Sequence, residues 1–255
     1  MPNTALITGA SSGIGREMAR YHASKGGDLI ITARRAPELA RLKAELEADH
    51  KVKVTTIALD LAAEGGALAL YEATRDERIE ILINNAGFGG HGKFLDRGLA
   101  ADLTMIDLNI RAVVALCHLV GKDMVARGSG KVLNVSSTAA YQPGPLQATY
   151  FATKAFVSTL SPALDFEWRP HGVTVTALEP GFVDTEFADV AAMTDLEMTK
   201  LGATPESVAQ FGYEAMLKGK LRVINDPKMR FMLNWLVPLL PRRMVLKMVN
   251  DMQTR

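Results

Sequence analysis

Short apolar runs alternate with segments of helical length from one end of the chain to the other, and this alternation constrains the fold more than any other feature. Several runs are apolar at consecutive positions, which is typical of strands buried on both faces of a parallel sheet. The pattern therefore predicts right-handed crossovers and a doubly wound α/β fold, with one parallel sheet of about seven strands and helices on both faces. The predicted strands are residues 4–8, 29–33, 52–59, 79–84, 131–136, 173–179 and 221–225.

Helix-start signals lie between these runs. A proline and a glutamate open the segment 37–49, and Leu39, Leu42 and Leu46 share one face of it, which predicts a helix. The same chemistry begins a second predicted helix at Thr204.

The chain has 255 residues, which is enough for one large α/β domain, and it contains no internal repeat and no linker. We therefore predict one Rossmann-type domain over residues 1–226, with residues 227–255 as a C-terminal helical extension of it.

Charge and cysteine content exclude several classes of protein. The net charge of +1 gives no electrostatic argument for a nucleic-acid partner. The single cysteine, Cys117, rules out an internal disulfide framework and suits a small core residue, and no Cys/His cluster has metal-ligand spacing. We find no signal peptide and no apolar stretch of the roughly 18 to 20 residues that span a membrane. We therefore expect a cytoplasmic protein without a metal site.

A glycine-rich segment follows the first predicted strand and opens a helix. Gly9 suits a tight turn, Gly13 lets backbone approach a pyrophosphate, and Gly15 permits close packing of helix on strand. Helix N-terminal amides attract phosphates, so this segment predicts a dinucleotide site. A purely structural turn is the alternative, because the spacing Gly-x-x-x-Gly-x-Gly differs from the general Gly-x-Gly-x-x-Gly fingerprint. The expected contacts are Gly9, Ser11, Ser12, Gly13, Ile14 and Gly15.

The end of the second predicted strand bears on the choice of dinucleotide. An NAD-specific site carries an acid near this point for the ribose 2′-hydroxyl. Here Ala33 is followed by Arg34 and Arg35, which suit bidentate contact with a 2′-phosphate. NADP(H) is therefore expected in preference to NAD(H), the alternative being two solvated arginines in front of a helix.

Polar and glycine residues recur where the other predicted strands end. Asp60 follows the third strand, 84–87 the fourth, Ser136 and Ser137 the fifth, and 180–181 the sixth. In open α/β sheets ligands bind outside the carboxyl ends of the strands, so these residues predict one long crevice.

Tyr150 and Lys154 are four residues apart, and on a helix they lie on one face. A tyrosine has an unperturbed pKa of about 10. An ammonium about 4 Å away contributes roughly 4 kcal/mol at an effective dielectric near 20, enough to lower that pKa by about three units. The pair then exchanges a proton near neutral pH, as carbonyl and alcohol chemistry requires. Taken alone, the pair fits a surface Tyr and Lys on a helix better than it fits a catalytic pair.

With these motifs in place, the chain resembles the short-chain dehydrogenase/reductase family from Thr4 to about Asn225. The motifs that carry the resemblance are 8–15, Asp60, 84–87, Asn109, Ser137, 150–154 and 180–185. It implies a catalytic tetrad of Asn109, Ser137, Tyr150 and Lys154. It also implies cofactor contacts from Asp60, Leu61, Asn85, Ala86, Gly87, Tyr150, Lys154, Pro180, Gly181, Val183 and Thr185.

The resemblance further implies that Ser137 donates a hydrogen bond to a substrate carbonyl and Tyr150 delivers the proton. Lys154 holds the nicotinamide ribose and lowers the pKa of Tyr150. Asn109 holds a water that links Lys154 to solvent; the alternative is a helix-interior amide bonded to its own backbone. We expect NADP(H)-dependent interconversion of a carbonyl and a secondary alcohol by a homodimer or homotetramer.

Two residues depart from the family pattern. Ser12 stands where many NADP-preferring members carry a basic residue, so NADP preference rests on the two arginines. Pro162 falls inside the helix that follows Lys154, where we expect a bend without loss of the site.

Residues that flank the motifs are expected to surround the substrate. They are Phe88, His91, Tyr141, Pro143, Leu146 and Phe182, together with Ser137 and Tyr150. Residues 187–201 suit either a mobile lid or an ordinary surface helix.

The tail 228–255 is apolar, rich in methionine and basic, with six Lys or Arg against one acid, Asp251. Pro238 and Pro241 divide it into two short helices. Packing on the same subunit or a partner subunit is the first interpretation, a wall of a lipophilic substrate pocket the second, and peripheral membrane contact the least favoured. A lipophilic small-molecule substrate (a ketone, steroid-like or acyl chain) is preferred.

Two further functions stay open. One is 3-oxoacyl thioester reduction, and the other is a non-catalytic NADP sensor or scaffold. The retention of Tyr150 and Lys154 argues against the sensor.

Overall fold

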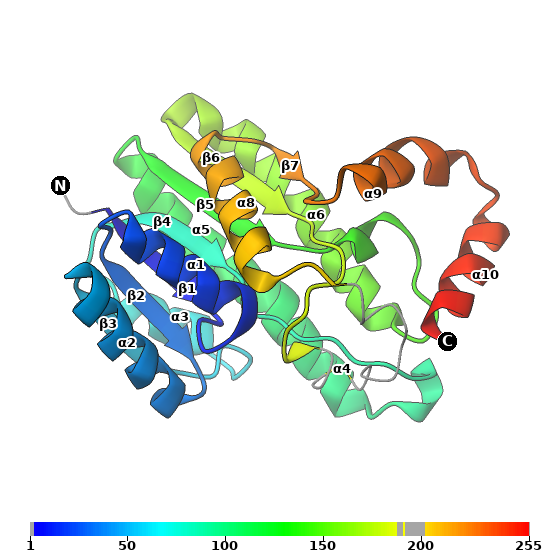
Figure 1. Ribbon diagram of the computed structural model, residues 1–255, viewed down its shortest axis with the longest axis horizontal. Helices are drawn as coiled ribbons and strands as arrows, with labels where there is room; N and C mark the ends of the chain where they lie inside the picture. Colours follow the sequence, from blue (N-terminus) through cyan, green and yellow to red (C-terminus); the bar gives the residue numbers. More distant parts are fainter. Residues whose placement is uncertain (1–2, 188–190, 192–201, 255) are drawn as a thin grey trace.

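Seven parallel strands form a single sheet in the computed structural model, which describes residues 3–187, 191 and 202–254 (Figure 1). The strand order is β3-β2-β1-β4-β5-β6-β7. The strands are β1 (Thr4–Thr8), β2 (Leu29–Ala33), β3 (Val54–Ala58), β4 (Ile79–Asn84), β5 (Gly130–Val135), β6 (Val173–Leu178) and β7 (Arg222–Val223). The predicted doubly wound fold is confirmed. The order reverses between β1 and β4, which is where open sheets of this kind leave a crevice for a ligand.

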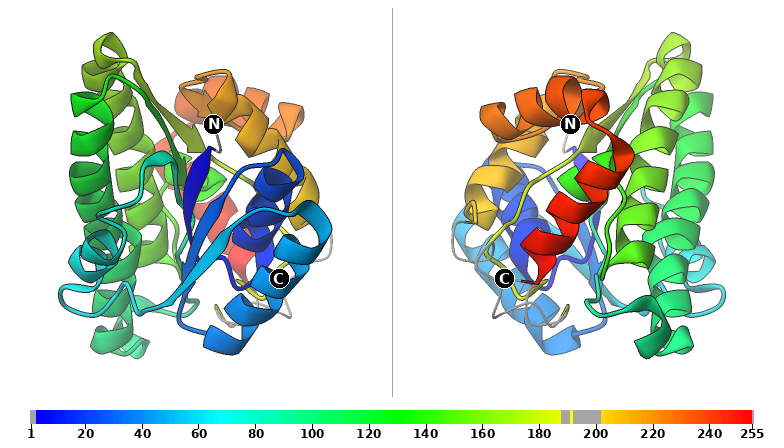
Figure 2. Two further views of the ribbon diagram at one scale, coloured as in Figure 1. Left: turned by 90° about the vertical axis from the view of Figure 1, so that its left-hand side faces the viewer. Right: turned by 90° about the vertical axis from the view of Figure 1, so that its right-hand side faces the viewer.

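Helices cover both faces of the sheet, as the edge-on views in Figure 2 show. The α-helices are α1 (Gly13–Ser24), α2 (Ala36–His50), α3 (Gly66–Ala73), α4 (Leu99–Ile106), α5 (Val113–Ala126), α6 (Ala148–Trp168), α8 (Pro205–Leu217), α9 (Pro227–Phe231) and α10 (Arg242–Gln253). Helices α1, α2 and α8 share one apolar cluster with one face of the sheet, and α3 and α5 share a second cluster with the other face. Cys117 lies in the second cluster, as predicted for a core residue.

Local sequence signals set most element ends. In β1, Ala5, Leu6 and Ile7 are all fully buried, which is the two-sided burial that their consecutive apolar character predicts. At the start of α8, the Thr204 hydroxyl accepts a hydrogen bond from the amide of Ser207 at 3.3 Å. Helix α6 runs through Pro162 to Trp168, so the start of the helix, which carries Tyr150 and Lys154, is intact.

One expectation about apolar stretches is wrong. Among the described residues, the helical stretch Leu99–Ala126 is long and apolar enough to cross a membrane by length and composition. Met105 of α4 is fully buried. Leu116 and Val120 of α5 are almost fully buried and join the second apolar cluster. One side of the stretch, within α5, therefore packs on the sheet of this domain, while Leu99 and Leu103 of α4 are exposed.

The C-terminal extension follows β7. Helix α9 continues as a π-helical turn, Met232–Leu236, and a 3₁₀ turn, Val237–Leu239, before Pro241 starts α10. Val245 and Val249 of α10 join a third apolar cluster with Tyr150 and Phe151 of α6. The extension therefore packs on the same part of the molecule that carries the Tyr150 motif (Figure 1).

Candidate functional site

A cavity of about 920 Å³ runs along the carboxyl ends of strands β1 to β6. Its lining begins at the glycine-rich turn after β1 and ends at the C-terminal extension. Of the cofactor contacts expected from the sequence, only Gly15 is not in the lining. The others line it: Gly9, Ser11, Ser12, Gly13, Ile14, Arg34, Arg35, Asp60, Leu61, Asn85, Ala86, Gly87, Tyr150, Lys154, Pro180, Gly181, Val183 and Thr185.

The glycine-rich turn has the backbone that a phosphate site needs. Gly9 and Gly13 have φ angles of +68° and +53°, a region that side chains other than glycine rarely adopt. Ser12 precedes α1 in an extended conformation, and its side chain makes no capping hydrogen bond. The first amides of α1 are therefore left to bind an anion at the cavity wall.

Gly15 lies just behind that wall. A Cβ atom there would collide with Asn85 Nδ2 and the Gly9 carbonyl, and Asn85 Nδ2 itself donates to Thr8 O at 3.0 Å. Gly15 thus lets α1 pack against the ends of β1 and β4, which is the packing role predicted for it.

The two arginines that were predicted to contact a 2′-phosphate follow β2. Arg34 and Arg35 both line the cavity, and Ala33 offers no carboxylate at the strand end. Arg35 donates to the Ser11 hydroxyl at 3.2 Å and pairs with Glu186 at 2.9 Å. The sequence did not single out Glu186. Both partners of this pair are about half exposed, so it contributes little stability and leaves the guanidinium available.

Three of the four predicted catalytic residues meet at the middle of the cavity. Ser137 follows β5 and starts a 3₁₀ turn, where its hydroxyl accepts from Ala139 N at 3.1 Å and donates to Pro180 O at 3.4 Å. Tyr150 and Lys154 lie on the first turns of α6 and are both buried. The Lys154 ammonium donates to Val135 O at 2.9 Å and lies 5.8 Å from the centre of the Tyr150 ring.

The expected effect of Lys154 on Tyr150 is not what this geometry produces. Burial raises the pKa of Tyr150 to about 12, against a lowering contribution from the Ser137 hydroxyl. Burial also lowers the pKa of Lys154 to about 8. Removing both groups from water disfavours both charged forms, and the ammonium is bonded to the Val135 carbonyl. The prediction of a lowered Tyr150 pKa is therefore wrong for the protein alone.

Asn109 lies behind the cavity wall, on a π-helical turn, Asp107–Ala112, between α4 and α5. Its amide donates to Phe88 O at 3.0 Å and to the Thr153 hydroxyl at 3.1 Å, and its oxygen accepts from Phe88 N at 3.2 Å. These partners lie on other segments, so the alternative in which Asn109 satisfies its own backbone is wrong. Irregular turns of this kind are frequent at functional sites. Asn109 fixes the segment after β4 against α6.

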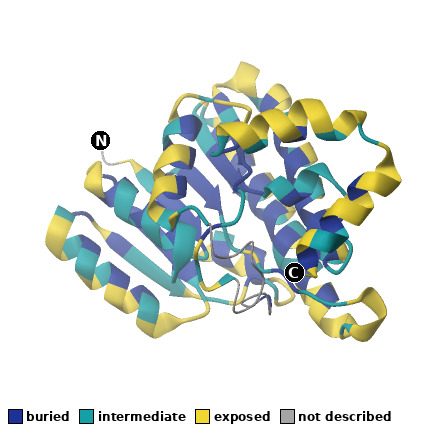
Figure 3. Ribbon diagram, turned by 45° about the vertical axis from the view of Figure 1, so that its right-hand side comes forward, coloured by how far each residue is buried: buried dark blue, intermediate teal, exposed yellow. Residues whose placement is uncertain are grey.

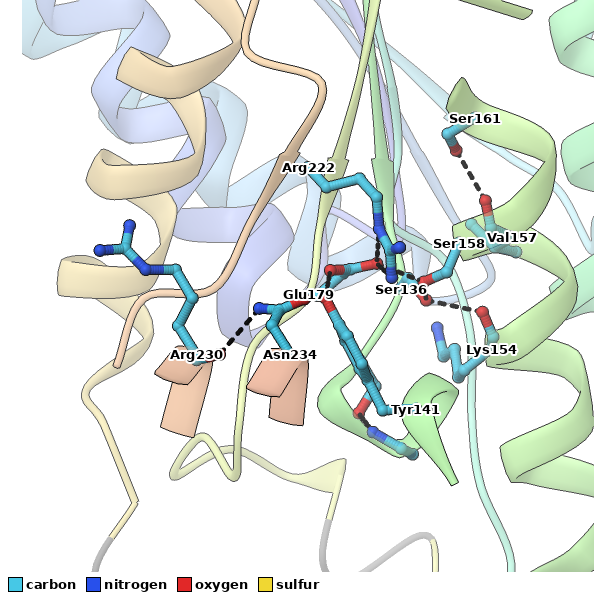
Figure 4. Close-up of polar contacts among 12 residues, drawn as sticks. Ser136, Tyr141, Lys154, Val157, Ser158, Ser161, Glu179, Arg222, Arg230 and Asn234 are labelled. Carbon is cyan, nitrogen blue, oxygen red and sulfur yellow. Dashed lines mark hydrogen bonds and ion pairs between the residues drawn. The ribbon is translucent and has the colours of Figure 1, made fainter. Parts of the chain in front are cut away.

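Glu179 is a residue whose importance the sequence did not reveal. Its carboxylate, at the end of β6, is fully buried and accepts from Tyr141 at 2.6 Å, Ser158 at 2.6 Å and Arg222 at 2.9 Å. Figure 4 shows these three side chains pointing toward it. Beside them, Ser136 donates to the carbonyl of Lys154 at 2.8 Å. The network joins β6, β7 and α6 directly behind the catalytic residues.

Only some of the predicted substrate residues reach the cavity. Phe88 and Phe182 line it with Ser137 and Tyr150. Four others are absent from the lining: His91, Tyr141, Pro143 and Leu146.

Contacts elsewhere explain three of these four corrections. The hydroxyl of Tyr141 is held by Glu179, and burial raises the pKa of Tyr141. A ring nitrogen of His91 bonds the Gln253 carbonyl at 2.9 Å. Leu146 has a left-handed backbone, and its carbonyl accepts from Gly92 N at 2.9 Å. Nothing in the structure accounts for the position of Pro143.

The C-terminal extension forms the far wall of the cavity. Gln253 at the end of this wall is bonded to Gln147, whose side-chain amide donates to Gln253 Oε1 at 2.5 Å. The pocket-wall interpretation of the tail therefore has direct geometric support. The residues of the extension that line the cavity are Met229, Met232, Leu233, Val237, Leu240, Val245, Met248, Val249, Met252 and Gln253.

The segment 187–201, predicted as a lid or a surface helix, lies outside the described residues apart from Phe187 and Ala191. The Phe187 ring lies 5.3 Å from the Tyr150 ring and lines the cavity.

The chain is similar to known proteins in both sequence and structure. A family model described as short chain dehydrogenase matches residues 3–195. A very-long-chain 3-oxoacyl-CoA reductase of Macaca fascicularis is 30% identical over 255 residues, covering 97% of this chain and 78% of that protein.

Two solved structures extend the comparison. A short-chain dehydrogenase from Sphingobium yanoikuyae, in complex with NADPH, is 32% identical with a TM-score of 0.85 and 92% of each chain covered. A bulky-bulky ketone specific alcohol dehydrogenase from Comamonas testosteroni is 28% identical with a TM-score of 0.80, covering 95% of this chain and 96% of that one.

Proposed function

The chain belongs to the short-chain dehydrogenase/reductase family, and from this premise we propose that it reduces a lipophilic ketone with NADPH or oxidises the corresponding secondary alcohol with NADP⁺. Members of this family are oxidoreductases that bind a nicotinamide cofactor and act on small molecules. The observation that carries the proposal is the position of Ser137, Tyr150 and Lys154. They lie between the glycine-rich end of the cavity and the end lined by the C-terminal extension.

The residues of the cavity fit a dinucleotide. Free helix amides and a turn that favours glycine lie at one end, with two arginines beside them. Arg34 and Arg35 would contact the 2′-phosphate that distinguishes NADP from NAD, and the absence of an acid at Ala33 agrees with this preference.

The chemistry that a bound nicotinamide supplies is hydride transfer at the carbonyl carbon. Tyr150 donates its phenolic proton to the carbonyl oxygen, so hydride and proton together give the alcohol; oxidation reverses both steps. Ser137 donates a hydrogen bond to the same oxygen and orients it. Tyr150, whose pKa burial raises to about 12, is protonated at neutral pH, as a proton donor must be before the reaction.

Lys154 and Asn109 support Tyr150. With its pKa lowered to about 8, Lys154 still carries its charge at neutral pH, and that charge stabilises the phenolate left after proton transfer. Asn109 holds the turn at Phe88 in position against α6, and a water bound there would connect Lys154 with solvent.

The lipophilic substrate is inferred from the far wall. Met229, Leu233 and Val249 are representative of a lining whose side chains are almost all apolar. Such a surface binds hydrocarbon by burial and lets methionines adapt to its shape.

A 3-oxoacyl thioester is the second candidate substrate. The similarity to a very-long-chain 3-oxoacyl-CoA reductase over nearly the whole chain favours it. The cytoplasmic location and the assembly into a homodimer or homotetramer remain predictions from the sequence.

The deciding experiment is the initial rate of NADPH consumption with short ketones, 3-oxoacyl thioesters, long-chain ketones and steroids, with NADH in parallel and Tyr150→Phe as control. We expect turnover of one lipophilic class, abolished in the variant. Tight NADPH binding without turnover of any compound would contradict the proposed reduction and favour a sensor.

A further inference from the structure

The helical stretch 227–239 is apolar on two opposite sides. Met229, Leu233 and Val237 are spaced four residues apart and line the cavity. Phe231, Trp235 and Leu239 have the same spacing but are offset by two residues, which places them on roughly the opposite side of these helical turns. These three side chains are 59%, 68% and 82% exposed.

Other exposed apolar side chains lie beside them. Figure 3 colours most of α9, of the turns after it and of α10 as exposed, and Figure 1 shows α9 and α10 at the same end of the molecule. We call this surface the outer face of the extension. Its exposed apolar residues are Phe231, Met232, Trp235, Leu236, Leu239, Met244, Leu246, Met248 and Met252. Soluble domains rarely expose so many large apolar side chains along one segment without a binding partner.

The charge of this face is positive. Its basic residues are Lys228, Arg230, Arg242, Arg243 and Lys247, all exposed, and none forms an ion pair with a described residue. Asp251 is the one acid between positions 228 and 254. Exposed Trp, Phe and Leu beside unpaired Lys and Arg are the composition of helices that lie in the surface of a bilayer.

This charge argues against a second copy of the chain as the partner. A twofold-symmetric contact places the same patch of both subunits face to face. Here it would bring five cations against five cations with one acid on each side, and like charges in contact oppose association. An anionic lipid surface instead offers hydrocarbon for the aromatic residues and phosphate for the cations.

We propose that the outer face of the extension docks on an anionic lipid surface. Met232, Met248 and Met252 both line the cavity and are exposed, so the rim of the cavity belongs to the docked face. If the substrate is the lipophilic ketone proposed above, it enters the cavity from the lipid side. The docking itself goes beyond the proposed reaction, and a binding measurement tests it without turnover.

The test is co-sedimentation of the full chain with vesicles of phosphatidylcholine, with and without phosphatidylserine. We expect binding to the anionic vesicles, weakened by added salt, and little binding to the neutral ones. Replacing Arg242, Arg243 and Lys247 by Gln should lower the partition coefficient by roughly one to two orders of magnitude. Phe231→Ser combined with Trp235→Ser should lower it by at least about tenfold.

Matched controls separate docking from loss of fold. Leu68→Ser removes an exposed leucine on α3, and a triple change of Lys51, Lys122 and Lys218 to Gln removes the same charge elsewhere. Both should bind vesicles as the parent does, and all variants should bind NADPH equally well, since none of the changed residues lines the cavity.

Two results would overturn the proposal. One is equal binding of the parent chain to neutral and anionic vesicles, or no binding to either. The other is a fall in the mass of the assembly, measured by sedimentation velocity, in Phe231→Ser/Trp235→Ser, with unchanged vesicle binding. This result would identify a second copy of the chain as the partner. Failure of either kind leaves the NADPH-consumption test of the proposed reaction unaffected.

Discussion

The two ends of the cavity are built from different parts of the chain and with different chemistry. At the end next to β1 and β2, the cavity is lined by the backbone of Gly9 and Gly13 and by the positive charges of Arg34 and Arg35. At the other end, mainly apolar side chains form the wall, and the flexible Met229 and Met248 are among them. The first surface is rigid and tolerates little change, whereas the second adapts to the shape of what it binds.

Under the proposed function, this difference separates recognition of the cofactor from recognition of the substrate. A phosphate group has one shape, so amides and guanidinium groups in set positions recognise it. A hydrocarbon has no directional groups, so its recognition depends on buried area and spreads over many side chains. Substitutions at the rigid end, and at Ser137, Tyr150 and Lys154 where the two ends meet (the junction), should therefore have the largest effects.

The largest effect is expected where the two ends meet. Tyr150→Phe removes only a hydroxyl, and we expect kcat to fall by about 10²- to 10⁴-fold with NADPH binding near normal. Stopped-flow rates and fluorescence titration with NADPH measure the two quantities. Tyr141→Phe is the matched control, because that hydroxyl contacts Glu179 and lies outside the cavity lining. Unchanged turnover in Tyr150→Phe would exclude this residue from proton transfer.

Glu179→Gln changes the network behind the junction. The substitution keeps the shape of the side chain but removes the charge that Arg222, Tyr141 and Ser158 hold in the core. We expect the free energy of unfolding to fall by about 2–3 kcal/mol, measured by urea denaturation. Glu186→Gln breaks a half-exposed pair and should cost less than about 1 kcal/mol. Equal losses in the two variants would contradict the importance of burial.

The arginines test the rigid end. Arg34→Ala and Arg35→Ala should each lower the ratio of kcat/KM for NADPH to that for NADH by roughly tenfold, since each would remove the charge-assisted contact proposed above for the 2′-phosphate. Arg41→Ala, an exposed arginine further along α2, is the control and should leave the ratio unchanged. A ratio near one in the parent protein would show that the sequence is a poor guide to cofactor choice.

A pair of conservative changes compares the two ends directly. In Gly13→Ala the new Cβ meets Thr185 at 3.0 Å in a left-handed backbone, so the Kd for NADPH should rise by about five- to tenfold. Met248→Leu, at the adaptable end, should change KM for the preferred substrate by less than about twofold. If Met248→Leu has the larger effect, the distinction between a rigid and an adaptable end is wrong.

The smallest effect is on the pH dependence of stability. Burial lowers the pKa of Lys154 from 10.5 to about 8, so between these values the unfolded chain binds more protons at this residue than the folded one. Its contribution to the free energy of unfolding therefore rises as pH rises from 8. Tyr150 opposes this only above pH 10, because its pKa is raised from 10.0 to about 12.

Thermal unfolding at pH 8 and pH 10 checks this, with Lys154→Met as the comparison. The Tm of the parent protein should rise relative to that of the variant, on the order of a few degrees. Parallel curves for the two proteins would show that Lys154 titrates normally.

Local sequence predicted the order of strands and helices well. The bounds of β1, β2 and β4 agree with the prediction to the residue, while the other strands differ by one or two residues at their ends. Strand ends depend on hydrogen bonds to neighbouring strands, which a local pattern does not contain. The structural roles of Gly9, Gly13 and Gly15 were equally predictable, because a positive φ or a close backbone approach disfavours other residues.

The alternation of apolar runs and helical segments along the chain determined the parallel sheet. Residue type and spacing within a few positions determined the glycine-rich turn and the placement of Tyr150 and Lys154 on one helix. The tertiary structure alone decided what surrounds them. His91 contacts Gln253, which lies 162 positions away, and Glu179 gathers partners from three other segments. The pKa of Tyr150 depends on how far water is excluded from it, and that exclusion exists only once distant segments, α10 among them, have packed around α6.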